Sequence, residues 1–277
     1  MSDFNKPIPK SDAESLLSGK PVYTEDLAPE KALVVKVLRS PHAFAEVIDV
    51  NAATALKIEG IEGIYSYKDV PDIRFCNSGQ SYPKPSPNDR KILDKWVRYV
   101  GDPVAIVAGS NEKVVDKALR LIKVEYKVLE PVLDPEKAMG SDQLVHPEED
   151  WNFQVNVGGS AKRNLIASGE QKQNDVDEVF EHCDVIVEEQ YTTKANSQVY
   201  METFRAHTWF DEHNRLCCLS STQIPFHVRR ILGTALGIPM SRVRVIKPRV
   251  GGGFGAKQTA VREFYPAFAT QKTGKRV

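Results

Sequence analysis

The first half of the chain alternates short apolar runs with polar turns. Five runs have the length and the β-branched content of strands, whereas residues 111–121 place their apolar side chains at helical spacing. The predicted strands are residues 32–38, 45–50, 61–65, 103–108 and 124–129. A short helix over residues 51–58 is also expected, after Asn51 as its N-cap. Strands and helices in this order predict a compact α/β domain over residues 18–140.

The second half shows a different pattern, which predicts a second domain over residues 166–277. Residues 1–17 are polar and are expected to form a flexible leader, and residues 141–165 a linker. The elements expected after the linker are a strand at 184–191, a hairpin of 206–210 with 216–219, a helix at 226–236 behind Pro225, a strand at 243–246 and a helix at 259–273.

A glycine-rich segment lies between the last predicted strand and the last predicted helix. Residues 249–258 read Arg-Val-Gly-Gly-Gly-Phe-Gly-Ala-Lys-Gln. Glycine allows positive φ angles and lets main-chain N–H groups approach a ligand that a Cβ would keep away. A strand, a glycine-rich turn and the start of a helix together predict a potential cradle for an anion.

This segment is not one of the familiar phosphate loops. Lys257 stands between Ala256 and Gln258, whereas a Walker loop has Gly before its Lys and Ser or Thr after it. The dinucleotide pattern also fails, because position 256 is not glycine. On the residues alone, a tight connection without a ligand remains an alternative.

Composition narrows the functional classes without choosing one. The 277 residues include 37 acidic and 37 basic side chains, which leaves no basic surface typical of nucleic-acid or membrane binding. The sequence has no apolar run long enough for a membrane span and no apolar core of a secretory signal near its start. The four cysteines are not spaced as iron–sulfur or zinc ligands, so we expect buried free thiols and a cytoplasmic protein.

Two motifs together resemble the xanthine dehydrogenase/aldehyde oxidase family of molybdenum hydroxylases. Gly-Gly-Gly-Phe-Gly is similar to the cofactor loop of that family, and Ser-Ser-Thr-Gln-Ile-Pro at residues 220–225 is similar to its Thr-Gln segment. Gln223 and Phe254 are 31 positions apart (254 − 223), as the family spacing requires. Ser-Pro-His-Ala at residues 40–43 and Gly-Asp-Pro-Val-Ala at residues 101–105 resemble the α/β-hammerhead domain of the same family.

The resemblance implies an α+β fold and a cofactor site. The fold would be an α/β-hammerhead domain followed by the first part of a mixed α/β domain that binds the molybdenum cofactor. Gln223 and Phe254 would lie near the molybdenum oxo group, with no direct protein ligand to the metal, and the Phe254 ring would pack locally while its N–H faces the cofactor. The residues implied to bind the cofactor are Gln223, Gly252, Gly253, Phe254 and Gly255.

Four further residues near these motifs have open roles. Gln258 would lie close to the substrate, where purine hydroxylases often carry a glutamate, so an amide here weakens a purine assignment. Lys257 and Arg249 could balance cofactor phosphate or could be solvated surface. The family also carries a glutamate at the position of Glu202, which on the residues alone favours a hydrogen-bonded structural carboxylate.

The implied activity is hydroxylation of a heterocycle or aldehyde carbon with water as oxygen source. The implied cofactor is molybdenum with molybdopterin or its cytosine dinucleotide, and [2Fe–2S] and FAD would be on partner chains of an oligomer. The resemblance covers only the N-terminal portion of the family's large subunit, and the catalytic base is expected beyond Val277, so this chain alone would be inactive. The alternative is a non-catalytic assembly module or truncated fragment, which an exposed apolar surface at Val261, Phe264 and Phe268 would favour.

Overall fold

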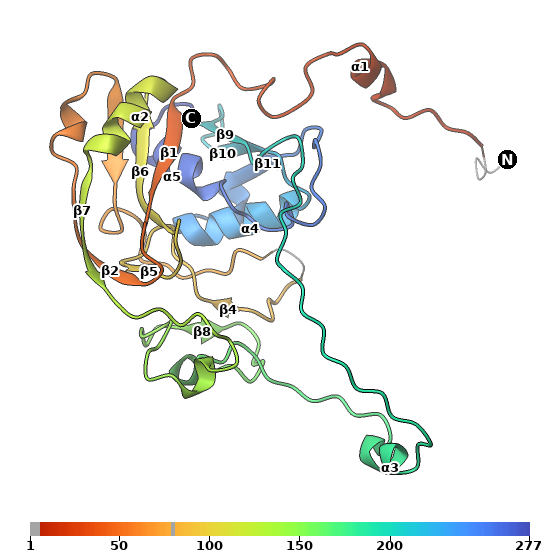
Figure 1. Cartoon of the computed structure of the whole chain (residues 1–277). Helices are drawn as coiled ribbons and strands as arrows, with labels where there is room; N and C mark the ends of the chain where they lie inside the picture. Colours follow the sequence, from red (N-terminus) through yellow and green to blue (C-terminus); the bar gives the residue numbers. More distant parts are fainter. Residues whose placement is uncertain (1–5, 79–80) are drawn as a thin grey trace.

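The computed structural model describes residues 6–78 and 81–277, and Figure 1 shows the arrangement of their helices and strands. The helices are α1 (Ala13–Leu17), α2 (Glu112–Leu121), α3 (Val176–Glu181), α4 (Pro225–Leu236) and α5 (Phe264–Thr273). The strands are β1 (Val34–Arg39), β2 (Ala45–Asn51), β3 (Ile61–Tyr65), β4 (Pro87–Asn88), β5 (Trp96–Val97), β6 (Pro103–Gly109), β7 (Lys123–Val128), β8 (Asn152–Phe153), β9 (Ala206–Phe210), β10 (Leu216–Ser220) and β11 (Val243–Ile246).

The first half folds as two small antiparallel sheets with α2 packed on one of them. One sheet has the order β1-β6-β3 and the other β5-β2-β7. Every residue of β6 is buried, which explains its run of small apolar side chains. Asn111 caps α2 by accepting a hydrogen bond from the Val114 N–H. The five predicted strands and this helix are therefore present, whereas residues 51–58 contain only a 3-10 turn, Ala55–Lys57.

The second half is built on a sheet of order β11-β10-β9. β10 is antiparallel to β9 and parallel to β11, and α4 forms the connection between the two parallel strands. Pro225 begins α4, and Gly237 ends it with a φ of +65°. Among the described residues, no helix combines the length and the apolar character that crossing a bilayer requires.

The last helix starts later than its apolar pattern predicts. α5 begins at Phe264, because the Glu263 carboxylate accepts hydrogen bonds from the N–H groups of Val261 and Arg262 and holds a turn there. Residues 259–263 therefore belong to the connection that leads from the glycine-rich segment into α5.

One hydrophobic core joins the two halves. The aromatic rings of Tyr65 and Phe268 meet edge to face at 5.3 Å, and those of Phe75 and Phe264 at 5.5 Å. Phe264 and Phe268 are 0% and 1% exposed, so these residues do not form the exposed apolar surface that would favour a non-catalytic module. The β1-β6-β3 sheet covers α5 and removes that argument for a non-catalytic module.

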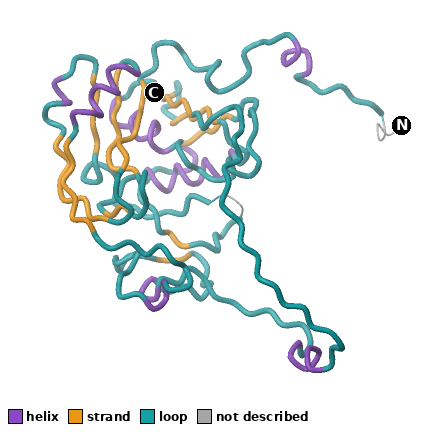
Figure 2. The backbone as a smooth tube through the Cα atoms, viewed as in Figure 1, coloured by secondary structure: helices purple, strands orange, loops and turns teal. Residues whose placement is uncertain are grey.

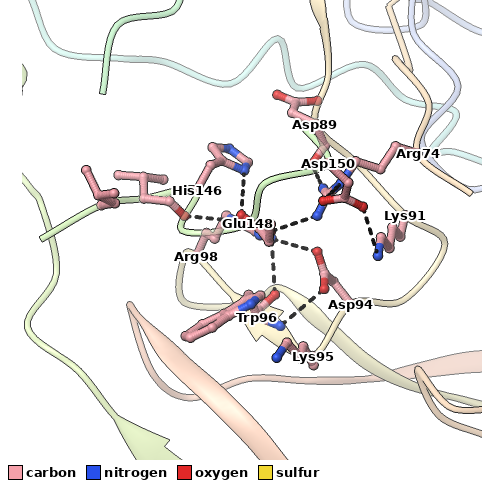
Figure 3. Close-up of polar contacts among 12 residues, drawn as sticks. Arg74, Asp89, Lys91, Asp94, Lys95, Trp96, Arg98, His146, Glu148 and Asp150 are labelled. Carbon is pink, nitrogen blue, oxygen red and sulfur yellow. Dashed lines mark hydrogen bonds and ion pairs between the residues drawn. The ribbon is translucent and has the colours of Figure 1, made fainter. Parts of the chain in front are cut away.

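A network of charged side chains holds residues 146–150 against the first half (Figure 3). Glu148 forms ion pairs with Arg98 and with Arg74, the latter at 3.0 Å, and Arg74 also contacts Asp150 at 2.7 Å. Burial alone would raise the pKa of Glu148, but His146 and the two guanidinium groups lower it to about 2. Part of the predicted linker is thus fixed by buried charges.

Residues 170–196 run away from the packed body as an extended arm with α3 near its tip (Figures 1 and 2). The predicted strand at residues 184–191 is wrong, since the structure has no strand there. Val185 and Val187 are 78% and 80% exposed. The alternating sequence has no neighbouring strand in the described residues to pair with, and a strand needs such a partner for its backbone hydrogen bonds.

Candidate functional site

The glycine-rich segment forms a folded loop between β11 and α5. Gly252 and Gly255 have φ angles of +100° and +87°, and Phe254 has +48°. The first two values favour glycine, and the third is in the left-handed region that side chains rarely adopt. The Ala256 N–H donates to the Gly253 carbonyl oxygen at 2.8 Å and closes the turn.

The loop leaves a row of main-chain donors available. Within the described residues, the N–H groups of positions 252–255 donate no hydrogen bond. Successive amides that change between left- and right-handed backbone form concavities suited to anionic or strongly polar oxygen atoms. The loop therefore has the donor set that an oxo group or a phosphate would need.

The structure brings Gln223 against this loop, as the two motifs predict. A Cβ added to Gly253 would lie 2.6 Å from Gln223 Oε1, so any side chain at position 253 would force the amide out of its present position. The Gln223 N–H also donates to the Lys257 carbonyl oxygen at 3.0 Å. Gln223 follows β10 and precedes α4, so the strand-to-helix junction and the glycine-rich loop form one site.

Two of the site side chains are open to solvent. Phe254 is 75% exposed, and its ring edge lies beside Gly252 of the same loop, where an added Cβ would be 3.3 Å from Cε2. Gln223 is also exposed, although its neighbour Gly253 is buried. Gln258 is half-buried, and its N–H donates to the Gly255 carbonyl oxygen at 3.1 Å.

An ion pair between the buried Lys257 and the half-buried Glu202 holds the loop in position. Lys257 is 0% exposed, and its Nζ lies 3.0 Å from Glu202 Oε2, 2.8 Å from the Glu202 carbonyl oxygen and 2.6 Å from Ser221 Oγ. Glu202 Oε2 also accepts hydrogen bonds from the Gly251 N–H at 2.7 Å and from Ser221 Oγ at 2.6 Å. These contacts connect the segment before β9, the end of β10 and both ends of the loop.

This network keeps Glu202 ionised. Burial would raise its pKa, but the hydrogen bonds from Ser221 and Gly251 and the charge of Lys257 lower it below its usual value. Glu202 therefore has the hydrogen-bonded structural role that its residue type favours. Its other oxygen, Oε1, is buried and has no partner in the described residues, so it can still accept a hydrogen bond.

Neither basic residue of the loop is a solvated surface cation or a free counter-charge. Lys257 pairs its charge with Glu202, and its Nζ also lies 4.8 Å from the centre of the Tyr200 ring. Arg249 forms an ion pair with Asp12, just before α1, and its N–H donates to the Val22 carbonyl oxygen. Both side chains therefore form ion pairs within the chain, and a role in balancing cofactor phosphate stays a prediction.

Sequence reasoning missed Ser221 and Tyr200 as parts of the site. Ser221 stands two positions before Gln223, and a hydroxyl there can reach the buried carboxylate. A Cβ at Gly252 would lie 2.8 Å from the Tyr200 Cβ, so the second loop glycine is required by packing. Only the neighbourhood of Glu202 in the sequence could have pointed to Tyr200.

Comparison with protein families identifies the family to which the chain belongs. The profile of the aldehyde oxidase and xanthine dehydrogenase a/b hammerhead domain matches residues 18–130, and that of the molybdopterin cofactor-binding domain matches residues 158–277. The chain belongs to the xanthine dehydrogenase/aldehyde oxidase family. It corresponds to the hammerhead domain and the start of the molybdopterin cofactor-binding domain, which confirms the predicted fold class and resemblance.

The curated relatives that this chain matches are longer than the chain itself. It is 37% identical to the probable hypoxanthine oxidase XdhD of Escherichia coli K12 over 99% of its own length and 31% of the relative's. It is 34% identical to the putative xanthine dehydrogenase molybdenum-binding subunit XdhA of the same strain, over 95% and 34% of the two chains. The chain thus spans about a third of the length of these relatives.

Solved structures show the same fold. Quinoline 2-oxidoreductase from Pseudomonas putida 86 superimposes with a TM-score of 0.81 at 24% identity, over 100% of this chain and 34% of that one. The aldehyde oxidoreductase from Desulfovibrio gigas gives a TM-score of 0.78 at 22% identity, over 97% and 29%. At these identities the likeness establishes the fold alone.

Proposed function

We propose that this chain is part of a molybdenum hydroxylase and that its glycine-rich loop, with Gln223, holds the molybdenum–molybdopterin cofactor. The observation that carries the proposal is the meeting of Gln223 with Gly253 beside four main-chain N–H groups that no described residue uses. A polar oxygen of a cofactor would complete those donors. When bound, the cofactor supplies the redox centre at which a carbon atom is oxidised with oxygen from water.

The residues present fit such a group. Gln223 can both donate and accept a hydrogen bond without adding charge, which suits a metal oxo group or a pterin ring. The amides of Gly253, Phe254 and Gly255 are preorganised donors, and donors fixed before a reaction stabilise developing negative charge effectively. The Glu202–Lys257 pair has a different role, because it positions the loop from inside the protein.

The proposed substrate is a heterocycle or an aldehyde, which would lie near Gln258. An amide at this position can orient a ring nitrogen or carbonyl by hydrogen bonding, but it cannot serve as an anion or take a proton. The proposed catalytic base, the [2Fe–2S] and flavin centres and the remaining part of the cofactor domain would come from polypeptide outside residues 1–277. We also propose that the protein is cytoplasmic and acts in an oligomeric complex.

Metal and pterin analysis tests the proposal. The chain purified together with its partner polypeptides should contain close to one molybdenum and one pterin per copy. Replacing Gln223 by Ala should lower cofactor content or activity, whereas replacing the exposed Lys117 on α2 by Ala should change neither. A full cofactor complement and unchanged activity in the Gln223→Ala protein would contradict the proposed role of this residue.

A further inference from the structure

A cavity that contains no residue of the glycine-rich loop lies beside α4. It has a volume of about 310 Å³, opens to solvent, and is lined by α4, the chain around residues 75–88 and Gln154. Its lining includes Lys84, Arg230, Cys76 and Tyr82. Two of the described residues that line it are cations, and none of them is an aspartate or a glutamate that could balance their charge.

Lys84 is an unusual member of this lining. It is only 3% exposed, yet its Nζ is buried without a hydrogen-bond partner among the described residues. The backbone is fixed at this point, since the Lys84 N–H donates to Gln154 Oε1 at 2.9 Å. A buried ammonium group without an acceptor is costly, and proteins almost always pair such a group with an anion.

Arg230 adds a second positive charge to the same cavity. From α4 its guanidinium donates to the Ser81 carbonyl oxygen at 3.2 Å and contacts His227 Nδ1 at 2.8 Å. The group lies 4.9 Å from the centre of the Tyr82 ring, which fixes its plane but does not neutralise its charge. Burial, followed by the charge of Arg230, lowers the pKa of Lys84.

We infer that the cavity between Lys84 and Arg230 is a binding site for a small oxyanion, such as a phosphate or a carboxylate group. An oxyanion would accept from the unpaired Lys84 ammonium and from the guanidinium, and it would neutralise two cations that now oppose each other. Arginine and lysine are the side chains that bind phosphate and carboxylate, the first through its planar donors and the second as a point charge. This site is independent of the proposed cofactor loop, because no residue that lines it belongs to residues 249–258.

Calorimetric titration of the full chain with inorganic phosphate tests the site, at pH 7 and at an ionic strength held constant with chloride. We expect one phosphate to bind per chain and the affinity to fall at least about tenfold in Lys84→Met, as loss of a charge-assisted hydrogen bond implies. Lys117→Met, an exposed lysine on α2, is the matched control and should bind as the parent does. A parallel titration with acetate distinguishes a tetrahedral oxyanion from a carboxylate.

Thermal unfolding without phosphate gives a second readout. Lys84→Met removes a buried cation that lacks a partner among the described residues, so its melting temperature should equal or exceed that of the parent and should no longer rise with phosphate. Arg230→Gln, at a half-buried position, should also weaken phosphate binding and remains informative if the lysine variant fails to fold. The inference is overturned if neither phosphate nor acetate binds the parent, or if both cavity variants bind them as tightly as the parent.

Discussion

Gln223 Oε1 lies so close to Gly253 that it would collide with the first carbon of a side chain at that position. A Cβ added there would lie 2.6 Å from this oxygen, a distance that real Cβ atoms essentially never show. The relationship explains why a glycine and a glutamine 30 positions apart (253 − 223) belong to one site. The absence of a side chain at position 253 therefore allows Gln223 its present position against the loop.

The Lys257–Glu202 pair should be essential for stability. Lys257→Met leaves a buried carboxylate without its cation, and breaking a buried pair from one side costs about 3–5 kcal/mol. Urea unfolding should show this loss in the free energy of unfolding. The double variant Lys257→Met/Glu202→Gln should lose less than the sum of the two single losses, because it leaves no unpaired charge. A loss below about 1 kcal/mol in Lys257→Met would contradict the structural role of the pair.

Glu148 should make the stability of the protein depend on acid. Its pKa is lowered from 4.5 to about 2 in the folded chain, so the stability it provides is complete above pH 4.5 and is lost as the pH falls towards 2. By linkage the contribution is on the order of 3 kcal/mol near neutral pH. Glu148→Gln should therefore be less stable at pH 7 and should lose less stability than the parent between pH 4.5 and 2.

The neighbouring Glu149 provides the matched control for this titration. It is exposed, and Glu149→Gln should leave the unfolding free energy and its pH profile close to those of the parent. Identical pH profiles for Glu148→Gln and the parent would show that the network in Figure 3 does not hold this segment by charge.

The shared core should make the two halves unfold together. Phe268 is 1% exposed and meets Tyr65 of β3, so Phe268→Ala should cost about 3–5 kcal/mol through lost burial and a cavity. Fluorescence changes from Trp96 in β5 and Trp209 in β9 can be separated in variants that keep only one of these two, with Trp151 also replaced by Phe. Both should report the same shifted transition, whereas a shift confined to Trp209 would indicate independent halves.

The sequence predicts most of the elements because their signals are local. The buried strand at residues 103–108, the helix behind Pro225 and the hairpin around Asp211 all depend on periodicity and turn chemistry within a few residues. The strand predicted at residues 184–191 fails because strand formation needs a neighbour that the described chain does not provide there. The late start of α5 depends on one carboxylate, Glu263, that binds the preceding N–H groups.

The site shows the same division between local and distant information. Gln223 and the loop glycines carry recognisable motifs, and their contact confirms that the two motifs meet. The burial of Lys257 could not be predicted, since it depends on Glu202 and Ser221 arriving from elsewhere in the chain. An exposed lysine and a fully buried lysine have the same sequence signal.

The central claim is that the glycine-rich loop holds the molybdenum cofactor, and Gly253→Val tests it most directly. We would measure molybdenum and pterin per chain in this variant, in the parent and in Gly140→Ala, whose added Cβ meets nothing within 4 Å, each purified with its partner polypeptides and shown to be folded. The account predicts close to one molybdenum and one pterin per chain in the parent and in Gly140→Ala, and near none in Gly253→Val. Full molybdenum and pterin content in folded Gly253→Val would contradict it.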